Sequence, residues 1–99
     1  MQIEYRNKRL EKICTLASMA QKKYGADMAE KIQQRIGEIF SADSVKEMIE
    51  YRIGRCHPLK GDRKGQYAVD LIQPHRMAFS IKGNTIEIAC IEEIIDDYH

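Results

Sequence analysis

The spacing of apolar residues changes near the middle of the chain, and this change limits the fold to one class. Up to about residue 50, apolar residues recur every three or four positions, which is the spacing of one face of an α-helix. From residue 67 onward they alternate with other residues, as in strands that bury one face. A chain of 99 residues can build one hydrophobic core. The sequence therefore predicts a single domain, residues 1–99, of the α+β class.

Two helical stripes precede the change. The first ends at Gly25, where a helix would stop, and the second follows after a short connection. This layout predicts an antiparallel helical hairpin. Ser44 and Glu47 have the spacing of a capping box, which predicts a short third helix through about Glu50. The first stripe is formed by Leu10, Ile13, Cys14, Ala17 and Ala20, and the second by Ala29, Ile32, Ile36, Ile39 and Phe40.

Strands are expected over residues 67–72, 76–81 and 85–91, with a tight turn at Gly83-Asn84 and a further short strand at residues 2–5. The later three should form an antiparallel meander. One face of that sheet must be covered, and the helical hairpin is the element available to cover it. We therefore expect a two-layer α+β fold.

Composition excludes several classes of protein. Hydrophobic residues at 43% and charged residues at 31% fit a globular domain, and no run of about 18 apolar residues would span a membrane. Residues 1–10 lack the apolar segment of a signal peptide, so we expect a cytoplasmic protein without membrane contacts. Cys14, Cys56 and Cys90 form no C-x-x-C pair and are expected to be reduced and mostly buried. Neither a nucleotide-binding motif nor a metal-binding motif is present, and no cofactor or metal is expected.

Charge is distributed unevenly although the net charge is only +1. Residues 52–76 carry six basic and two acidic side chains, whereas residues 87–99 carry five acidic and no basic ones. Two interpretations remain open. The two regions pair with each other internally, or the basic region binds a polyanion with carboxylates at its rim.

The basic region and the chain's last residues contain the groups that metal-free RNA cleavage requires: a base for the 2′-hydroxyl, cations for the phosphorane, and an acid for the leaving oxygen. Taken singly, each also has an ordinary explanation. His57 could be a surface histidine, Arg76 could pair with Asp70, and the terminal residues could be frayed. Residue chemistry alone predicts a possible polyanion-binding α+β domain. The candidates are His57, Lys60, Arg63, Lys64, Arg76, Asp97, Tyr98 and His99.

Three segments resemble HigB-like toxins of the RelE/ParE superfamily. Residues 57–63 read HPLKGDR with Gly65 following, residues 76–79 read RMAF, and residues 97–99 read DYH. The resemblance implies a RelE-like fold and a ribosome-dependent mRNA endonuclease. It also implies neutralisation by a helix-turn-helix, HigA-like antitoxin, through which the toxin would reach operator DNA.

The resemblance further implies a site. Its catalytic residues would be His57, Lys60, Asp97, Tyr98 and His99, with Arg76, Arg63 and Lys64 binding the substrate. His57 and His99 would share the acid and base roles, with the division between them left open. Where several relatives have an asparagine, this chain has Gln73-Pro74-His75, which leaves the role of His75 open. Two alternatives are a ParE-like toxin that poisons DNA gyrase and an inert remnant, and the terminal residues favour the nuclease.

Overall fold

The computed structural model describes residues 1–96, which form helices and one sheet as the spacing of apolar residues predicts. The α-helices are α1 (Lys8–Thr15), α2 (Ala17–Tyr24), α3 (Ala26–Ser41) and α4 (Val45–Glu50). Short 3₁₀ helices are η1 (Ile53–Arg55) and η2 (Gly61–Arg63). The strands are β1 (Gln2–Tyr5), β2 (His57–Pro58), β3 (Gln66–Asp70), β4 (His75–Lys82) and β5 (Ile88–Asp96).

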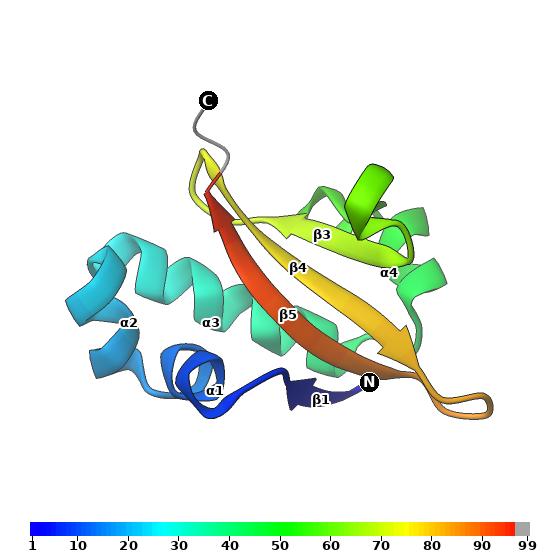
Figure 1. Ribbon diagram of the computed structural model, residues 1–99, viewed down its shortest axis with the longest axis horizontal. Coiled ribbons are helices and arrows are strands. Elements are labelled where there is room, and N and C mark those ends of the chain that lie inside the picture. The colour runs from blue at the N-terminus through cyan, green and yellow to red at the C-terminus, as the bar shows by residue number, and fades with distance from the viewer. Residues whose placement is uncertain (97–99) are drawn as a thin grey trace.

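The sheet has five strands in the order β1-β5-β4-β3-β2 (Figure 1). Strands β3, β4 and β5 form the expected antiparallel meander, in which β4 and β5 are the long central pair. Strand β2 adds antiparallel to β3 at one edge, and β1 adds parallel to β5 at the other. Residues from both ends of the described chain therefore meet in one sheet.

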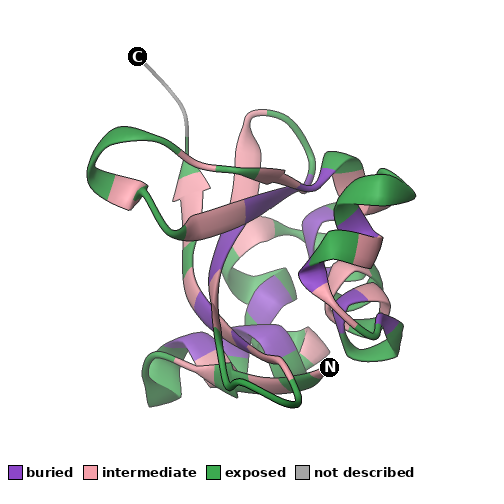
Figure 2. Cartoon of the chain, turned by 90° about the vertical axis from the view of Figure 1, so that its right-hand side faces the viewer, coloured by how far each residue is buried: buried purple, intermediate pink, exposed green. Residues whose placement is uncertain are grey.

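The core lies between the sheet and the helices. Chain direction reverses between α2 and α3, which gives the predicted hairpin (Figure 1). The hairpin covers one face of the sheet, and the buried stretches of the strands face it (Figure 2). The largest fully buried side chains come from α3, α4 and all three meander strands: Ile32, Ile39, Met48, Val69, Met77, Phe79 and Ile91. The two-layer arrangement is confirmed.

The first helical stripe is two helices, not one. Leu16 has extended backbone angles (φ −114°, ψ 107°), and its amide ends α1 while its carbonyl begins α2. No glycine or proline marks this break in the sequence. The kink redirects the chain so that α2 packs along α3 while Leu10, Ile13 and Cys14 of α1 remain in the core.

Two further expectations were wrong in detail. Phe40 is 67% exposed, because it lies one position beyond Ile39 and therefore about 100° around α3 from the buried stripe. The last strand begins at Ile88 and not at residue 85, since the chain folds back tightly after Gly83 (φ 95°). It continues to Asp96, and Ala89 and Ile91 are its fully buried residues. The capping box is present, with the Ser44 hydroxyl accepting from the Glu47 amide at 3.1 Å.

Candidate functional site

A groove lies on the sheet face that points away from the helices. Its volume is about 350 Å³, and it is formed by β2, β4 and the segment between β2 and β3. Four of its residues were candidates from the sequence, and the fold brings them together across 19 positions of chain. The residues lining the groove are His57, Pro58, Leu59, Lys60, Arg63 and Arg76.

Two buried alanines lie on the same face of the sheet as His57. Ala68 of β3 stands opposite both His57 of β2 and Ala78 of β4 in the strand register. Both alanines are fully buried, although their neighbours Val69 and Met77 point to the opposite, helix-covered face. Small side chains at these positions allow residues 57–65 to lie close against the sheet.

The two ring nitrogens of His57 contact two different partners. Its Nδ1 lies 2.8 Å from the carbonyl oxygen of Arg55, and its Nε2 lies 3.4 Å from Nη1 of Arg76. A carbonyl can only accept a hydrogen bond and a guanidinium can only donate one. Both contacts therefore require a neutral imidazole with its proton on Nδ1. The lone pair on Nε2 then points toward the Arg76 side of the groove.

Arg63 is held by two side chains of the sheet. Its guanidinium forms an ion pair with Glu93 of β5 and donates to the Gln66 side-chain oxygen at 2.9 Å. These contacts fasten η2 onto the sheet and leave the Arg63 side chain 31% exposed. Lys60 is exposed at the rim of the groove, and Lys64 is exposed on the same segment but does not line it.

Arg76 and Asp70, the pair that would give Arg76 an ordinary structural role, are opposite each other in the β3–β4 register. The carboxylate of Asp70 also forms an ion pair with Arg55 at 3.4 Å. The internal-pairing interpretation therefore holds for Arg63 and Glu93, whereas polyanion binding by the basic region stays a prediction. Arg55 and Arg63 pair with acids internally, while His57, Lys60 and Arg76 face the groove.

His75 lies on the other side of β4 from Arg76. Its ring makes an edge-to-face contact with Tyr24 of α2, with 5.6 Å between ring centroids. The alternation of strand side chains thus separates the two neighbours. His75 packs against the helices and is no part of the groove.

Asp97, Tyr98 and His99 lie outside the described residues. The described chain ends at Asp96, which stands opposite His75 in the register, while Ile95 stands opposite Arg76. Strand β5 therefore leaves the sheet beside the end of β4 that carries Arg76.

The cysteines offer no activated thiol. Cys56 directly precedes His57, but its side chain belongs to the hydrophobic core. Burial raises the pKa of the Cys56 thiol to about 11 and that of Cys14 to about 12. Both thiols are therefore protonated at neutral pH. Cys90 is half-buried, and all three are free.

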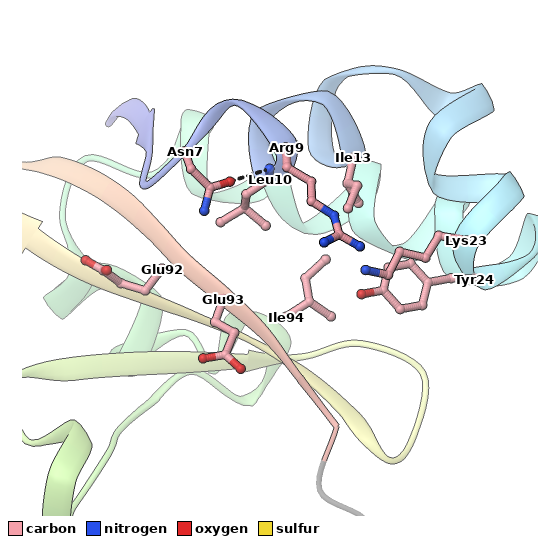
Figure 3. A pocket seen from close by; sticks show the side chains of 9 residues that line it. All are labelled: Asn7, Arg9, Leu10, Ile13, Lys23, Tyr24, Glu92, Glu93 and Ile94. Atoms are coloured by element: carbon pink, nitrogen blue, oxygen red, sulfur yellow. Dashed lines mark hydrogen bonds between the residues drawn. The ribbon is translucent and has the colours of Figure 1, made fainter.

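A second hollow, of about 260 Å³, lies between the helices and β5 (Figure 3). Leu10, Tyr24 and Ile94 point into it from α1, α2 and β5, while Glu93 turns away from the helices (Figure 3). Burial raises the pKa of the Tyr24 hydroxyl. Arg9 and Lys23 give this hollow positive charge, but none of the residues that line it is a histidine. The groove at His57 is therefore the better candidate for chemistry on a polyanion.

Within residues 1–96, no group of three or more His, Cys, Asp or Glu side chains is arranged to hold a metal ion. In the same part of the chain, no helix has both the length and the apolar character needed to cross a membrane.

Several of these contacts leave no signal in the sequence. The Arg55 carbonyl, the Asp70 carboxylate and Glu93 support the groove from three different elements. They do not share a motif or a fixed spacing. Only the fold shows that they belong to the site.

Comparison with known proteins is informative at the level of the fold. Neither a protein-family model nor a curated protein matches the sequence. Among solved structures, the fold is similar to that of a YoeB/ParE toxin from Agrobacterium tumefaciens, with a TM-score of 0.67. The alignment covers 99% of this chain and 100% of that chain at 19% sequence identity. The likeness shows that the two chains share a fold, which agrees with the fold expected from the sequence.

Proposed function

We propose that this chain is the toxin of a type II toxin–antitoxin pair and that it cleaves mRNA on the ribosome at the groove around His57. The observation that carries the proposal is the His57–Arg76 geometry. A neutral imidazole turns its Nε2 lone pair toward the guanidinium of Arg76, which places a proton acceptor beside a cation for phosphate. The shared fold with a YoeB/ParE toxin supports the same class of protein.

The proposed reaction uses the RNA's own 2′-hydroxyl as the nucleophile. Nε2 of His57 takes the proton of this hydroxyl, and the freed oxygen attacks the adjacent phosphorus. Arg76 and Lys60 stabilise the negative charge that develops on the phosphorane oxygens. The P–O5′ bond then breaks, and an acid returns a proton to the leaving oxygen. The products are a 2′,3′-cyclic phosphate and a free 5′-hydroxyl.

The acid of this scheme is assigned to the final three residues, Asp97, Tyr98 and His99. They follow Asp96 in the sequence, and the preceding residue, Ile95, is the register partner of Arg76. The described part of β5 therefore ends beside the end of β4 that carries Arg76.

The shape of the groove suits an mRNA that is held in place by the ribosome and not by the groove itself. It is open, and its lining combines the imidazole of His57 with three cationic side chains, Lys60, Arg63 and Arg76. In the proposed function the ribosome presents the mRNA, so the activity belongs to the cytoplasm. A helix-turn-helix antitoxin of the HigA-like kind would neutralise the toxin and carry it to operator DNA.

The first prediction compares two histidines on opposite faces of the sheet, His57 of β2 and His75 of β4. Induced expression of the wild-type chain should arrest growth and cut ribosome-bound transcripts. His57→Gln should abolish both effects, because it removes the proton acceptor. His75→Gln is the matched control and should keep both, because His75 packs against Tyr24 outside the groove. Growth curves and primer extension on ribosome-bound mRNA provide the measurement.

Circular dichroism of both purified variants would verify that each is folded. Arrest that persists in His57→Gln would contradict the proposal. So would intact transcripts accompanied by trapped gyrase–DNA breaks, which is the outcome expected of a gyrase poison.

A further inference from the structure

The backbone immediately before His57 adopts an uncommon conformation. Arg52 (φ 54°), Gly54 (φ 57°) and Arg55 (φ 55°) all have left-handed angles. Glycine adopts these angles freely, but a residue with a Cβ does so rarely. Two arginines in this region within four positions require support from the surrounding structure.

The support comes from the sheet and from α3. The Arg55 amide donates to the Arg52 carbonyl at 3.1 Å, and the Arg55 guanidinium pairs with Asp70 at 3.4 Å. Beneath the turn, Nε of Arg35 donates to the backbone oxygen of Asp70 at 2.6 Å. A Cβ added at Gly54 would lie 2.8 Å from Nε of Arg35, so the turn sits directly on that side chain. Arg35 and Asp70 thus fix the turn from below.

The left-handed turn directs the Arg55 carbonyl at the ring of His57. Two residues along the chain, Nδ1 of the imidazole donates to that oxygen over 2.8 Å. In ordinary extended backbone the carbonyl of Arg55 would point elsewhere, and Nδ1 would lose its acceptor. The hydrogen bond made by one ring nitrogen sets which form the other takes.

From this geometry we infer that Arg55 is a positioning residue, whose left-handed carbonyl holds His57 in its Nδ1-protonated tautomer. Nε2 is thereby reserved as the proton acceptor of the site, and the proton donor must be a different residue. The assignment of a tautomer stands on the structure of the turn, whereas its role in cleavage rests on the proposed function. With this tautomer, His57 is the base and another residue is the acid, a division that the sequence leaves open.

Two substitutions at position 55 separate backbone geometry from the ion pair. Arg55→Asn and Arg55→Val both remove the guanidinium and its pairing with Asp70. Asparagine tolerates the left-handed region and should keep the carbonyl in place. Valine is β-branched and should leave that region, which turns the carbonyl away from Nδ1. Any difference between the two variants therefore reports the backbone.

The tautomer is read by long-range proton–nitrogen correlation spectra of ¹⁵N-labelled protein, with His57→Gln used to assign the signals. Wild type and Arg55→Asn should show Nδ1 protonated, and Arg55→Val should show the proton moved substantially to Nε2. Cleavage of ribosome-bound mRNA should fall at least about tenfold in Arg55→Val relative to Arg55→Asn, because a misplaced histidine tautomer can cost up to roughly 10⁴-fold in turnover.

An Nε2-protonated His57 in the wild-type protein would overturn the inference, and that result does not depend on whether either variant folds. An unchanged tautomer in folded Arg55→Val would overturn it as well. A wild-type protein that has the expected tautomer but never cleaves RNA would refute the proposed function and leave the positioning role of Arg55 supported.

Discussion

The strand residues of the groove owe their positions to the face of the sheet on which their side chains lie. His57, Ala68 and Ala78 share one face of the sheet, while Val69 and Met77 share the other. Side chains alternate along a strand, so a shift of one residue would exchange groove and core. Arg76 therefore reaches the groove only because its strand neighbour Met77 is anchored in the core, where it is fully buried.

Arg76 supplies a further prediction at this level. Arg76→Gln removes the charge beside Nε2 of His57 and should slow cleavage by about 10²–10³-fold, the effect of losing one preorganised donor to a developing oxyanion. Arg76→Lys keeps the charge but loses the planar, forked donor, so its rate should lie between those of Gln and wild type. Single-turnover cleavage of ribosome-bound mRNA measures both. Equal rates for all three proteins would show that Arg76 has no part in the reaction.

The loop between β2 and β3 is the element that closes the groove, and its attachment to the sheet is local. Arg63 joins η2 to Glu93 of β5 and to Gln66 at the start of β3. The Arg63–Glu93 pair is partly exposed, at 31% and 49% of the two side chains, so it should add at most about 1 kcal/mol to global stability. Its main effect should be on the position of the loop and of Lys60.

Charge reversal tests this attachment. Glu93→Arg places a second cation beside Arg63 and should loosen residues 59–65, which raises their amide hydrogen exchange and lowers cleavage. The double variant Arg63→Glu with Glu93→Arg restores an opposite-charge pair and should recover most of the loop's protection. Hydrogen-exchange mass spectrometry of the free protein measures the loop directly. If the double variant exchanges as fast as the single one, the ion pair does not hold the loop.

Periodicity predicted the elements whose burial is decided within one segment. The buried stripe of α3 and the alternation along β3 and β4 follow from that signal. The break at Leu16 and the parallel pairing of β1 with β5 depend on contacts between distant segments, and no local pattern encodes them. The same holds for the site. His57, Lys60 and Arg76 could be named from residue chemistry, whereas Arg55, Asp70 and Glu93 act through a carbonyl or an ion pair that only the fold creates.

The molecule as a whole combines one small core with one open groove on the far side of the sheet. The helices bury one face, and the short segment from β2 to β3 covers part of the other. A chain that shares 19% sequence identity has the same fold, so this arrangement tolerates extensive replacement of side chains. The chemistry therefore depends on the side chains of the groove and not on the fold alone.

Core burial of thiols predicts how global stability depends on pH. The pKa of Cys14 rises from 9.0 to about 12 on folding, and that of Cys56 rises from 9.0 to about 11. Above about pH 9 the unfolded chain therefore loses thiol protons that the folded chain retains. The free energy of unfolding should be unaffected by these groups below about pH 8 and should decrease between about pH 9 and pH 11.

Urea denaturation under reducing conditions measures this dependence. The decrease should be smaller in Cys14→Ala, which removes one of the two thiols, although that variant will also be less stable at every pH because of the cavity. A free energy of unfolding that rises with pH in the alkaline range would contradict the assigned burial.

The proposed chemistry is tested most sharply by the nucleophile that it names. The cleavage site on a ribosome-bound mRNA is first mapped by primer extension, and the message is then synthesised with a single 2′-deoxy nucleotide on the 5′ side of that site. The proposal predicts cleavage of the all-ribose message with a 5′-hydroxyl on the downstream fragment, and no cleavage at the substituted position. Cleavage that survives the substitution, or a 5′-phosphate on the downstream fragment, would contradict it.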